Sequence, residues 1–217
     1  MENELPKYTH KQELWNTLTH LAGVLFSIGV FIFILVKHVN GNLSLSFMYP
    51  FYIYVFTMFL VFSVSTIYHA SPLDSNLRRV FRVIDHADIY LFVAGTYTPL
   101  CINAIANQGI SLGLIIAEYA LALAGILITV FFLGNKKMDL VGYIIYLVAG
   151  WALMFVYPFN RCLSNDIFVW ILSGGIVYTV GAIGYGIGKK NFWFHTVFHI
   201  FIVLAAVLQF VGVYSIF

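Results

Sequence analysis

Apolar residues run along this chain in seven long stretches separated by short polar segments, at about 18–37, 47–69, 83–105, 109–133, 140–159, 166–188 and 192–216. Each stretch is long enough for a helix of about 20 residues, the length that crosses the hydrocarbon core of a bilayer. None alternates apolar and polar residues as the strands of a membrane barrel do. The pattern predicts an all-α membrane protein, a seven-transmembrane-helix bundle that forms a single domain over residues 1–217.

The composition points the same way and excludes several classes of partner. The chain is 61% hydrophobic and only 9% charged, whereas soluble domains carry about 25% charged residues. Seven spans occupy roughly 140 positions, which leaves no room for a soluble domain. No basic and aromatic patch suggests nucleic acid. We expect the lipid bilayer and a membrane lipid or fatty-acyl ligand as partners, and a homo-oligomer stays open.

Basic residues collect on alternate sides of the predicted spans. Nine of the eleven fall on one side, and only Lys37 and Arg161 fall on the other. Because positive charge stays in the cytoplasm, we expect a cytoplasmic N-terminus and an external C-terminus. G-protein-coupled receptors run the opposite way, which disfavours that class. The nine residues are Lys7, Lys11, Arg78, Arg79, Arg82, Lys136, Lys137, Lys189 and Lys190.

The segment before the first span has a helix-start pattern. Thr9 and Gln12 have the spacing of a capping box, which predicts a short interfacial helix that runs into the first span. Glu13, Asn16 and His20 then share one helical face. Polar residues at headgroup depth need no chemistry, so a surface role and a role in a site both stay open for these three.

Two histidines open the last span four residues apart, at His195 and His199. That spacing places both imidazoles on one helical face, where they can bind a single metal ion. An ionisable side chain inside a membrane span is expensive and is a functional hypothesis by default. The pair therefore favours a membrane metalloprotein over a scaffold.

The predicted topology brings further polar residues to the same depth. His69 ends the second span, Asp85 and Asp88 begin the third, and His20 begins the first, all on the cytoplasmic side. Three imidazoles, from His69, His195 and His199, would leave one open position on a tetrahedral zinc ion, as in catalytic sites. Zn²⁺ is the expected cofactor. Asp85 is the candidate to hold a metal-bound water, as a base or as an orienting partner of the ligands.

Other residues have open roles. Ser65 lies one turn before His69 and can stabilise an oxyanion, although serines in membrane helices often bond back to the carbonyl four residues earlier. Asp88 can share a proton with Asp85 or pair with a loop arginine. Glu118, near the middle of the fourth span, can be protonated, bonded to a neighbouring helix or part of a proton path. Cys101 and Cys162 both map to the outer side, so a disulfide between them stays open.

Four segments together resemble the hemolysin III family, the bacterial branch of the progestin and adipoQ receptor superfamily: ELWNTLTH at 13–20, STIYH at 65–69, DHADIYLFVAGTYTP at 85–99 and HTVFH at 195–199. The resemblance covers nearly the whole chain. It implies seven helices with an inside N-terminus, and a location in the bacterial inner membrane. It also implies that His69, His195 and His199 bind zinc and that Asp85 contacts the metal through a water molecule. The chain departs from the bacterial pattern at Asp88, where an extra acid would change the charge of the site.

Three functions are then in competition. The superfamily is similar to the alkaline ceramidases, which favours a zinc-dependent hydrolase of lipid amide or ester bonds at the cytoplasmic leaflet. In it Asp85 would position water and Ser65 would assist the oxyanion. A non-enzymatic sensor or regulator of membrane homeostasis with structural zinc is the alternative. A pore-forming cytolysin, which the family name suggests, suits a chain with seven spans and no soluble domain least well.

Overall fold

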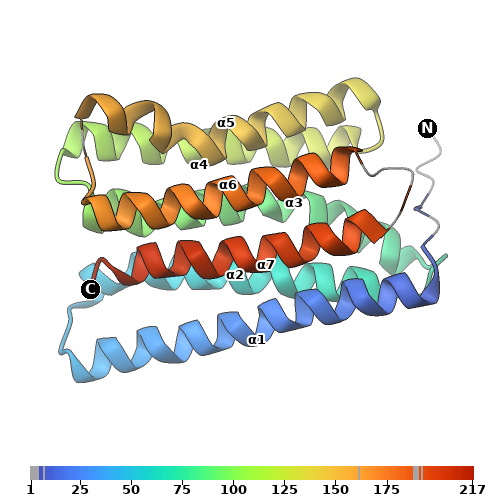
Figure 1. Cartoon of the computed structure of the whole chain (residues 1–217), viewed down its shortest axis with the longest axis horizontal. Coiled ribbons are helices and arrows are strands. Elements are labelled where there is room, and N and C mark those ends of the chain that lie inside the picture. Colours follow the sequence, from blue (N-terminus) through green and yellow to red (C-terminus); the bar gives the residue numbers. More distant parts are fainter. Residues whose placement is uncertain (1–4, 7, 161, 188–190, 192) are drawn as a thin grey trace.

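The described residues of the computed structural model form a bundle of long helices and contain no strand (Figure 1). The structure describes residues 5–6, 8–160, 162–187, 191 and 193–217. Of the basic residues used for the orientation, Lys7, Arg161, Lys189 and Lys190 lie outside these ranges. The elements are α1 (His10–Asn40), α2 (Leu45–Ala70), α3 (Asn76–Pro99), the short π-helix η1 (Leu100–Ala104), α4 (Gln108–Phe132), α5 (Lys136–Asn160), α6 (Asn165–Ile187) and α7 (Trp193–Tyr214).

Helix α1 begins where the capping pattern predicts. The Thr9 hydroxyl accepts a hydrogen bond from the Gln12 backbone N–H, and the Gln12 side chain accepts one from the Thr9 N–H. The predicted short interfacial helix does run into the first span, and the two form one helix, because α1 continues from His10 without a break to Asn40. Glu13, Asn16 and His20 are therefore carried on one rigid helix and keep a fixed spacing along it.

Helix α3 differs most from its prediction. It begins at Asn76, where the Ser75 hydroxyl caps the N–H of Arg78. The arginines expected in a loop, Arg78, Arg79 and Arg82, therefore lie in the first two turns of a helix. The prediction placed the start of this helix at the beginning of the apolar run, so it missed the charged first turns that precede the run. Six helices are long and apolar enough to cross a membrane by length and composition, and α3 is not among them.

Successive helices pack side by side from α1 to α5, and the C-terminal helix α7 lies between α6 and α1 (Figure 1). Close approach of α2 and α3 depends on Gly95, because a Cβ there would lie 2.1 Å from the Thr57 hydroxyl oxygen. Helices α5 and α6 are consecutive in the chain but touch at few points. This loose contact leaves space inside the bundle between α5, α6 and α3.

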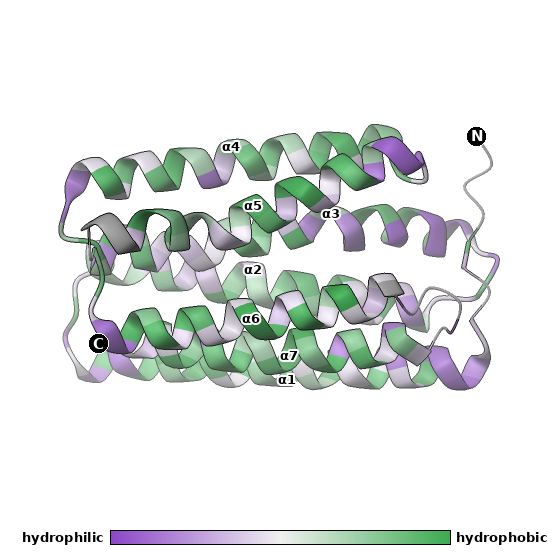
Figure 2. Cartoon of the chain, turned by 45° about the horizontal axis from the view of Figure 1, so that its top comes forward, coloured by the Kyte–Doolittle hydropathy of each residue, from purple (hydrophilic) through white to green (hydrophobic). Residues whose placement is uncertain are grey.

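Apolar residues cover the middle of the bundle, whereas hydrophilic residues gather toward the helix ends (Figure 2). Many large apolar side chains, such as Leu25, Phe56, Leu123 and Phe131, are exposed on the outer faces of different helices. Such a surface is expected of helices that face lipid. The N-terminal end of α1 and α7 and the C-terminal end of α2 lie at one end of the bundle (Figure 1).

Candidate metal centre

Three buried histidines meet at this end of the bundle. His69 comes from the last turn of α2, and His195 and His199 come from the first two turns of α7. The Nε2 atom of His195 lies 3.2 Å from that of His69 and 3.0 Å from that of His199. Within the part of the chain that the structure describes, these three side chains form the one group of histidine, cysteine and acidic residues arranged to hold a metal ion.

The geometry of the three nitrogens fits a shared cation. Ligand nitrogens about 2.0–2.1 Å from a tetrahedral zinc ion lie about 3.3–3.4 Å from one another. Hydrogen bonds alone do not account for the cluster, because His195 Nε2 faces two other ring nitrogens and carries at most one proton. With three imidazole ligands, a tetrahedral ion keeps one position for water or substrate.

Partners on helix α1 set the tautomers of two of these rings. His69 Nδ1 lies 2.6 Å from Glu13 Oε2 and donates to it, so His69 Nε2 carries a lone pair. His199 Nδ1 lies 3.3 Å from the Asn16 backbone carbonyl and donates there, which leaves its Nε2 free to bind. The Asn16 side chain also accepts a hydrogen bond of 2.5 Å from Thr196 on α7. Such outer partners orient metal ligands and raise their basicity.

Arg78 completes this arrangement, although sequence reasoning counted it only as a loop charge. Its side chain is fully buried, and its Nη2 donates to Glu13 Oε1. The same carboxylate therefore joins the guanidinium to the ring of His69. A sequence signal did exist, because Arg78 lies seven residues before Asp85 and so shares a face of α3 with it.

His20 lies beside the cluster rather than within it. Its ring centroid is 3.8 Å from that of His199, and Phe62 packs edge-on against it. Both ring nitrogens are buried and have no hydrogen-bond partner among the described residues. His20 borders the adjoining cavity, so its nitrogens are placed to meet a bound molecule.

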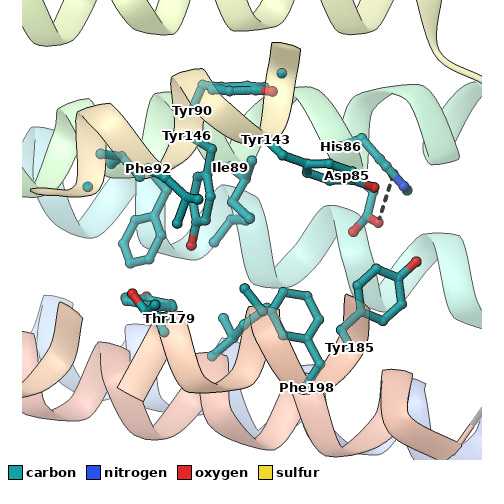
Figure 3. Close-up of a pocket in the computed structure, with 18 of the residues that line it drawn as sticks. Asp85, His86, Ile89, Tyr90, Phe92, Tyr143, Tyr146, Thr179, Tyr185 and Phe198 are labelled. Atoms are coloured by element: carbon teal, nitrogen blue, oxygen red, sulfur yellow. Dashed lines mark ion pairs between the residues drawn. The ribbon is translucent and has the colours of Figure 1, made fainter. Parts of the chain in front are cut away.

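A cavity of about 460 Å³ extends from the histidines into the bundle, lined by all seven α-helices. Figure 3 shows Asp85 and His86 at one end of it, where His86 Nδ1 lies 3.5 Å from Asp85 Oδ2. Asp85 thus borders the same cavity as His195 and His199 but is not a member of the histidine group. The structure pairs it with His86, a partner that the sequence did not indicate.

Ser65 also borders the cavity. Its hydroxyl is buried and makes no hydrogen bond within the described chain, so it does not bond back to the carbonyl four residues earlier. Thr66, its neighbour, does make such a bond, to the Phe62 carbonyl at 2.7 Å. The Ser65 hydroxyl is therefore available to a ligand in the cavity.

Beyond its polar end the cavity is long and mainly apolar. Along α6 its lining runs from Tyr185 and Gly186 back to Ile171, a distance of roughly 20 Å at 1.5 Å per residue. Phe198 lines it beside Tyr185, and Phe92, Tyr146 and Thr179 line it farther from Asp85 (Figure 3). The cavity therefore joins a polar end beside the histidines to a long apolar interior.

Comparison with known proteins assigns the chain to a family. The model of the family described as "Haemolysin-III related" matches residues 8–210. The chain belongs to the haemolysin-III-related family. It is 34% identical over 196 residues to the "Hemolysin-3 homolog" of Bacillus subtilis (strain 168), covering 90% of this chain and 89% of that protein. It is 33% identical over 201 residues to "Hemolysin-3" of Bacillus cereus, covering 92% and 89%.

Four further candidate residues of this haemolysin-III-related chain, Asp88, Glu118, Cys101 and Cys162, stay outside the metal cluster. The carboxyl oxygens of Asp88 are buried and have no hydrogen-bond partner among the described residues, so Asp88 is not paired with an arginine. Glu118 on α4 is fully buried, and its carboxyl oxygens also lack a partner there. Cys101 and Cys162 are free thiols, so the disulfide left open by the sequence is absent between them.

Proposed function

We propose that this protein is a zinc-dependent hydrolase of lipid amide or ester bonds. The observation that carries the proposal is the meeting of three buried histidine nitrogens at the polar end of a long apolar cavity. A cavity of this kind holds the chain of a lipid and presents its first polar bond to the metal. Soluble substrates would not need an apolar channel roughly 20 Å long.

The proposed chemistry distributes simple tasks among a few side chains. His69, His195 and His199 would hold zinc, which when bound activates water and polarises a carbonyl. Asp85, at the same end of the cavity, would take a proton from the attacking water and return it to the leaving group. The free Ser65 hydroxyl would donate a hydrogen bond to the carbonyl oxygen as negative charge develops there.

The proposed location is the cytoplasmic leaflet of the bacterial inner membrane. It rests on the clustering of nine of eleven basic residues on one side of the seven predicted spans, because positive charge favours the cytoplasmic side. Helix α3 would be the seventh span, with its charged first turns at the interface and its apolar second half in the bilayer. An acyl chain would then enter from the membrane, and a polar product would leave toward the cytoplasm.

Turnover by the purified protein tests the proposal. Zinc-loaded protein in lipid nanodiscs is incubated with ceramide-like lipids and other acyl amides and esters, and released fatty acid is measured. We expect release by the native chain and none by His195→Ala, which removes a metal ligand. The substitution His10→Ala is the matched control, because His10 is exposed and is not a member of the histidine group. Absence of fatty-acid release from every lipid class would refute the hydrolase.

A non-enzymatic membrane regulator is the second candidate, and one set of contacts favours it. Zinc on His69 and His199 would join α2 to α7, and the Asn16–Thr196 bond already joins α1 to α7. A metal in this position would act as a clamp whose strength a bound lipid could alter. This function predicts that zinc removal lowers the melting temperature strongly while no lipid is ever cleaved.

The names of the Bacillus relatives suggest lysis as a third function. A pore-forming cytolysin would cause leakage that osmotic protectants block according to their size. Leakage that no protectant blocks would instead indicate general disturbance of the membrane by an overproduced integral protein.

A further inference from the structure

Arg78 is a fully enclosed charge at the end of α2, beside the histidine cluster. It is 0% exposed, and its Nη1 donates hydrogen bonds of 3.1 Å to the backbone carbonyls of Tyr68 and Ser71. Its guanidinium carbon lies 4.7 Å from the centre of the Tyr68 ring. Both carbonyls flank His69 at the end of α2. Since burying a charge is costly unless it is paired and hydrogen-bonded, this position demands a specific compensating partner.

Glu13 is that partner, and it also contacts the metal cluster. One carboxylate oxygen accepts from Arg78, and the other accepts from His69 Nδ1 at 2.6 Å. The carboxylate is only slightly exposed, and Glu13 lies in the first turn of α1. Without the guanidinium, one oxygen of this buried carboxylate would lose its hydrogen bond, and the carboxylate would turn away from His69 toward water.

We propose that Arg78 is a positioning residue of the metal centre, which holds Glu13 against His69 Nδ1 so that His69 Nε2 points at the metal. The inference rests on the metal site of the proposed function. It adds a residue of α3, which supplies no histidine to the cluster, to the groups that determine zinc affinity. The ion pair joins α3 to α1, and the bonds of Arg78 to the Tyr68 and Ser71 carbonyls hold both to the end of α2. The bond from the His69 ring to Glu13 raises the basicity of the ligand nitrogen.

A purely structural role for Arg78 makes different predictions. An arginine that only anchors the end of α2 would affect the stability of the metal-free protein, and zinc affinity per folded molecule would not change. It would also act independently of Glu13, so the effects of the two substitutions would add. An arginine that acts through Glu13 loses its influence on zinc once Glu13 can no longer accept from the ring as a carboxylate.

Zinc affinity of the full-length protein in nanodiscs is the measurement, made by competition with a chelator of known affinity. We expect Arg78→Gln to weaken zinc binding by about 10–100-fold. Arg78→Lys keeps the charge but cannot bridge two carbonyls and a carboxylate as a planar fork does, so we expect an intermediate loss. Arg79→Gln is the matched control, because the next arginine along α3 is exposed. We expect it to bind zinc as the native chain does.

Two further readouts separate positioning from anchoring. In a Glu13→Gln background, Arg78→Gln should cause no additional loss of zinc affinity. The visible spectrum of the Co²⁺-substituted protein should change with Arg78→Lys and not with Arg79→Gln. If Arg78→Gln does not fold, two other variants distinguish positioning from anchoring. These are Arg78→Lys and the double variant Glu13→Gln/Arg78→Gln, in which no carboxylate is left unpaired.

The outcomes also separate this inference from the proposed function. Native zinc affinity in folded Arg78→Gln and Arg78→Lys, or additive losses with Glu13→Gln, would overturn the positioning role and leave the metal site intact. A native protein that binds no zinc would overturn both. Zinc binding that depends on Arg78 without any lipid cleavage would support the inference and refute the hydrolase.

Discussion

At the scale of single residues, the candidate site contains buried polar groups whose hydrogen-bonding capacity is not used within the described residues. His195 Nδ1, both nitrogens of His20 and the Ser65 hydroxyl make no hydrogen bond in the described part of the chain. Buried polar groups are nearly always satisfied, because each unsatisfied group costs free energy. Three residues of this kind beside one cavity therefore indicate a place where a ligand completes the bonding.

The Ser65 hydroxyl provides a test at this scale. Ser65→Ala should lower kcat by about 10²–10³-fold, as loss of one oxyanion donor does, while zinc content stays at the native level. The control is Ser63→Ala, because Ser63 is on the same helix and does not border the cavity. Native turnover in Ser65→Ala, measured as fatty-acid release, would remove Ser65 from the reaction.

Sequence reasoning identified the histidines but not what holds them. His195 and His199 are marked by their spacing, and the order of the spans places His69 at the same depth. The sequence signal at Arg78, its seven-residue spacing from Asp85, was weak, because an arginine near a span end usually indicates only the orientation of the chain. Whether a guanidinium is buried depends on the carbonyls and the carboxylate that surround it, and these come from two other helices.

At the scale of helices, α1 does the most to organise the site without supplying a ligand to the three-histidine group. Its face with Glu13 and Asn16 touches both α2 and α7 through the bonds to His69 and Thr196. The spacing of that face was evident in the sequence, but its direction was not, since polar residues at headgroup depth can equally face water. Its capped start at Thr9 was predictable because the signal is local.

The contact between α2 and α3 depends on a glycine. In Gly95→Ala the new Cβ would lie 2.1 Å from the hydroxyl oxygen of Thr57 and 2.9 Å from its Cβ, so the two helices must separate. We expect a loss of about 1–3 kcal/mol in the free energy of unfolding, as for overpacked cores. Gly113→Ala on α4 meets no atom within 4 Å and should be neutral or slightly stabilising. Thermal unfolding in detergent measures both, and equal melting temperatures would contradict this packing.

Two positions on opposite sides of α4, Gln108 at its start and Lys137 in the first turn of α5, test the predicted orientation. In a chain with Cys101→Ser and Cys162→Ser, a cysteine at Gln108 should react with a membrane-impermeant thiol reagent added to intact spheroplasts. A cysteine at Lys137 should react only after the membrane is opened. Both positions are exposed, so access across the membrane decides the result. The reverse pattern would place the histidine cluster at the outer leaflet.

At the scale of the whole molecule, the cavity results from how the helices close the bundle. Helices α5 and α6 follow each other in the chain yet touch at few points, and residues of both line the space between them. The sequence could not predict this, because apolar runs define helices without saying which neighbours meet. The number and order of the helices were predictable, whereas the cavity required the packing.

Filling the cavity should change which lipids are accepted. Gly175 borders the cavity on α6, and a Cβ there would meet no atom within 4 Å. It lies about 15 Å along α6 from Tyr185 and the histidine end. Gly175→Leu should therefore abolish hydrolysis of long-chain lipids and spare short-chain ones, with native zinc content. Gly184→Leu is the control, because Gly184 has equal space but does not border the cavity. An unchanged chain-length preference in Gly175→Leu would show that the chain lies elsewhere.

The most direct test of the central claim is a crystal structure of the zinc-loaded protein with anomalous scattering recorded on both sides of the zinc absorption edge. We predict one strong peak about 2.0–2.1 Å from the Nε2 atoms of His69, His195 and His199, with a fourth position that faces the cavity and is filled by water or lipid. A peak elsewhere, or none at the three histidines, would contradict the metal centre. A fourth ligand from the protein would contradict its catalytic role.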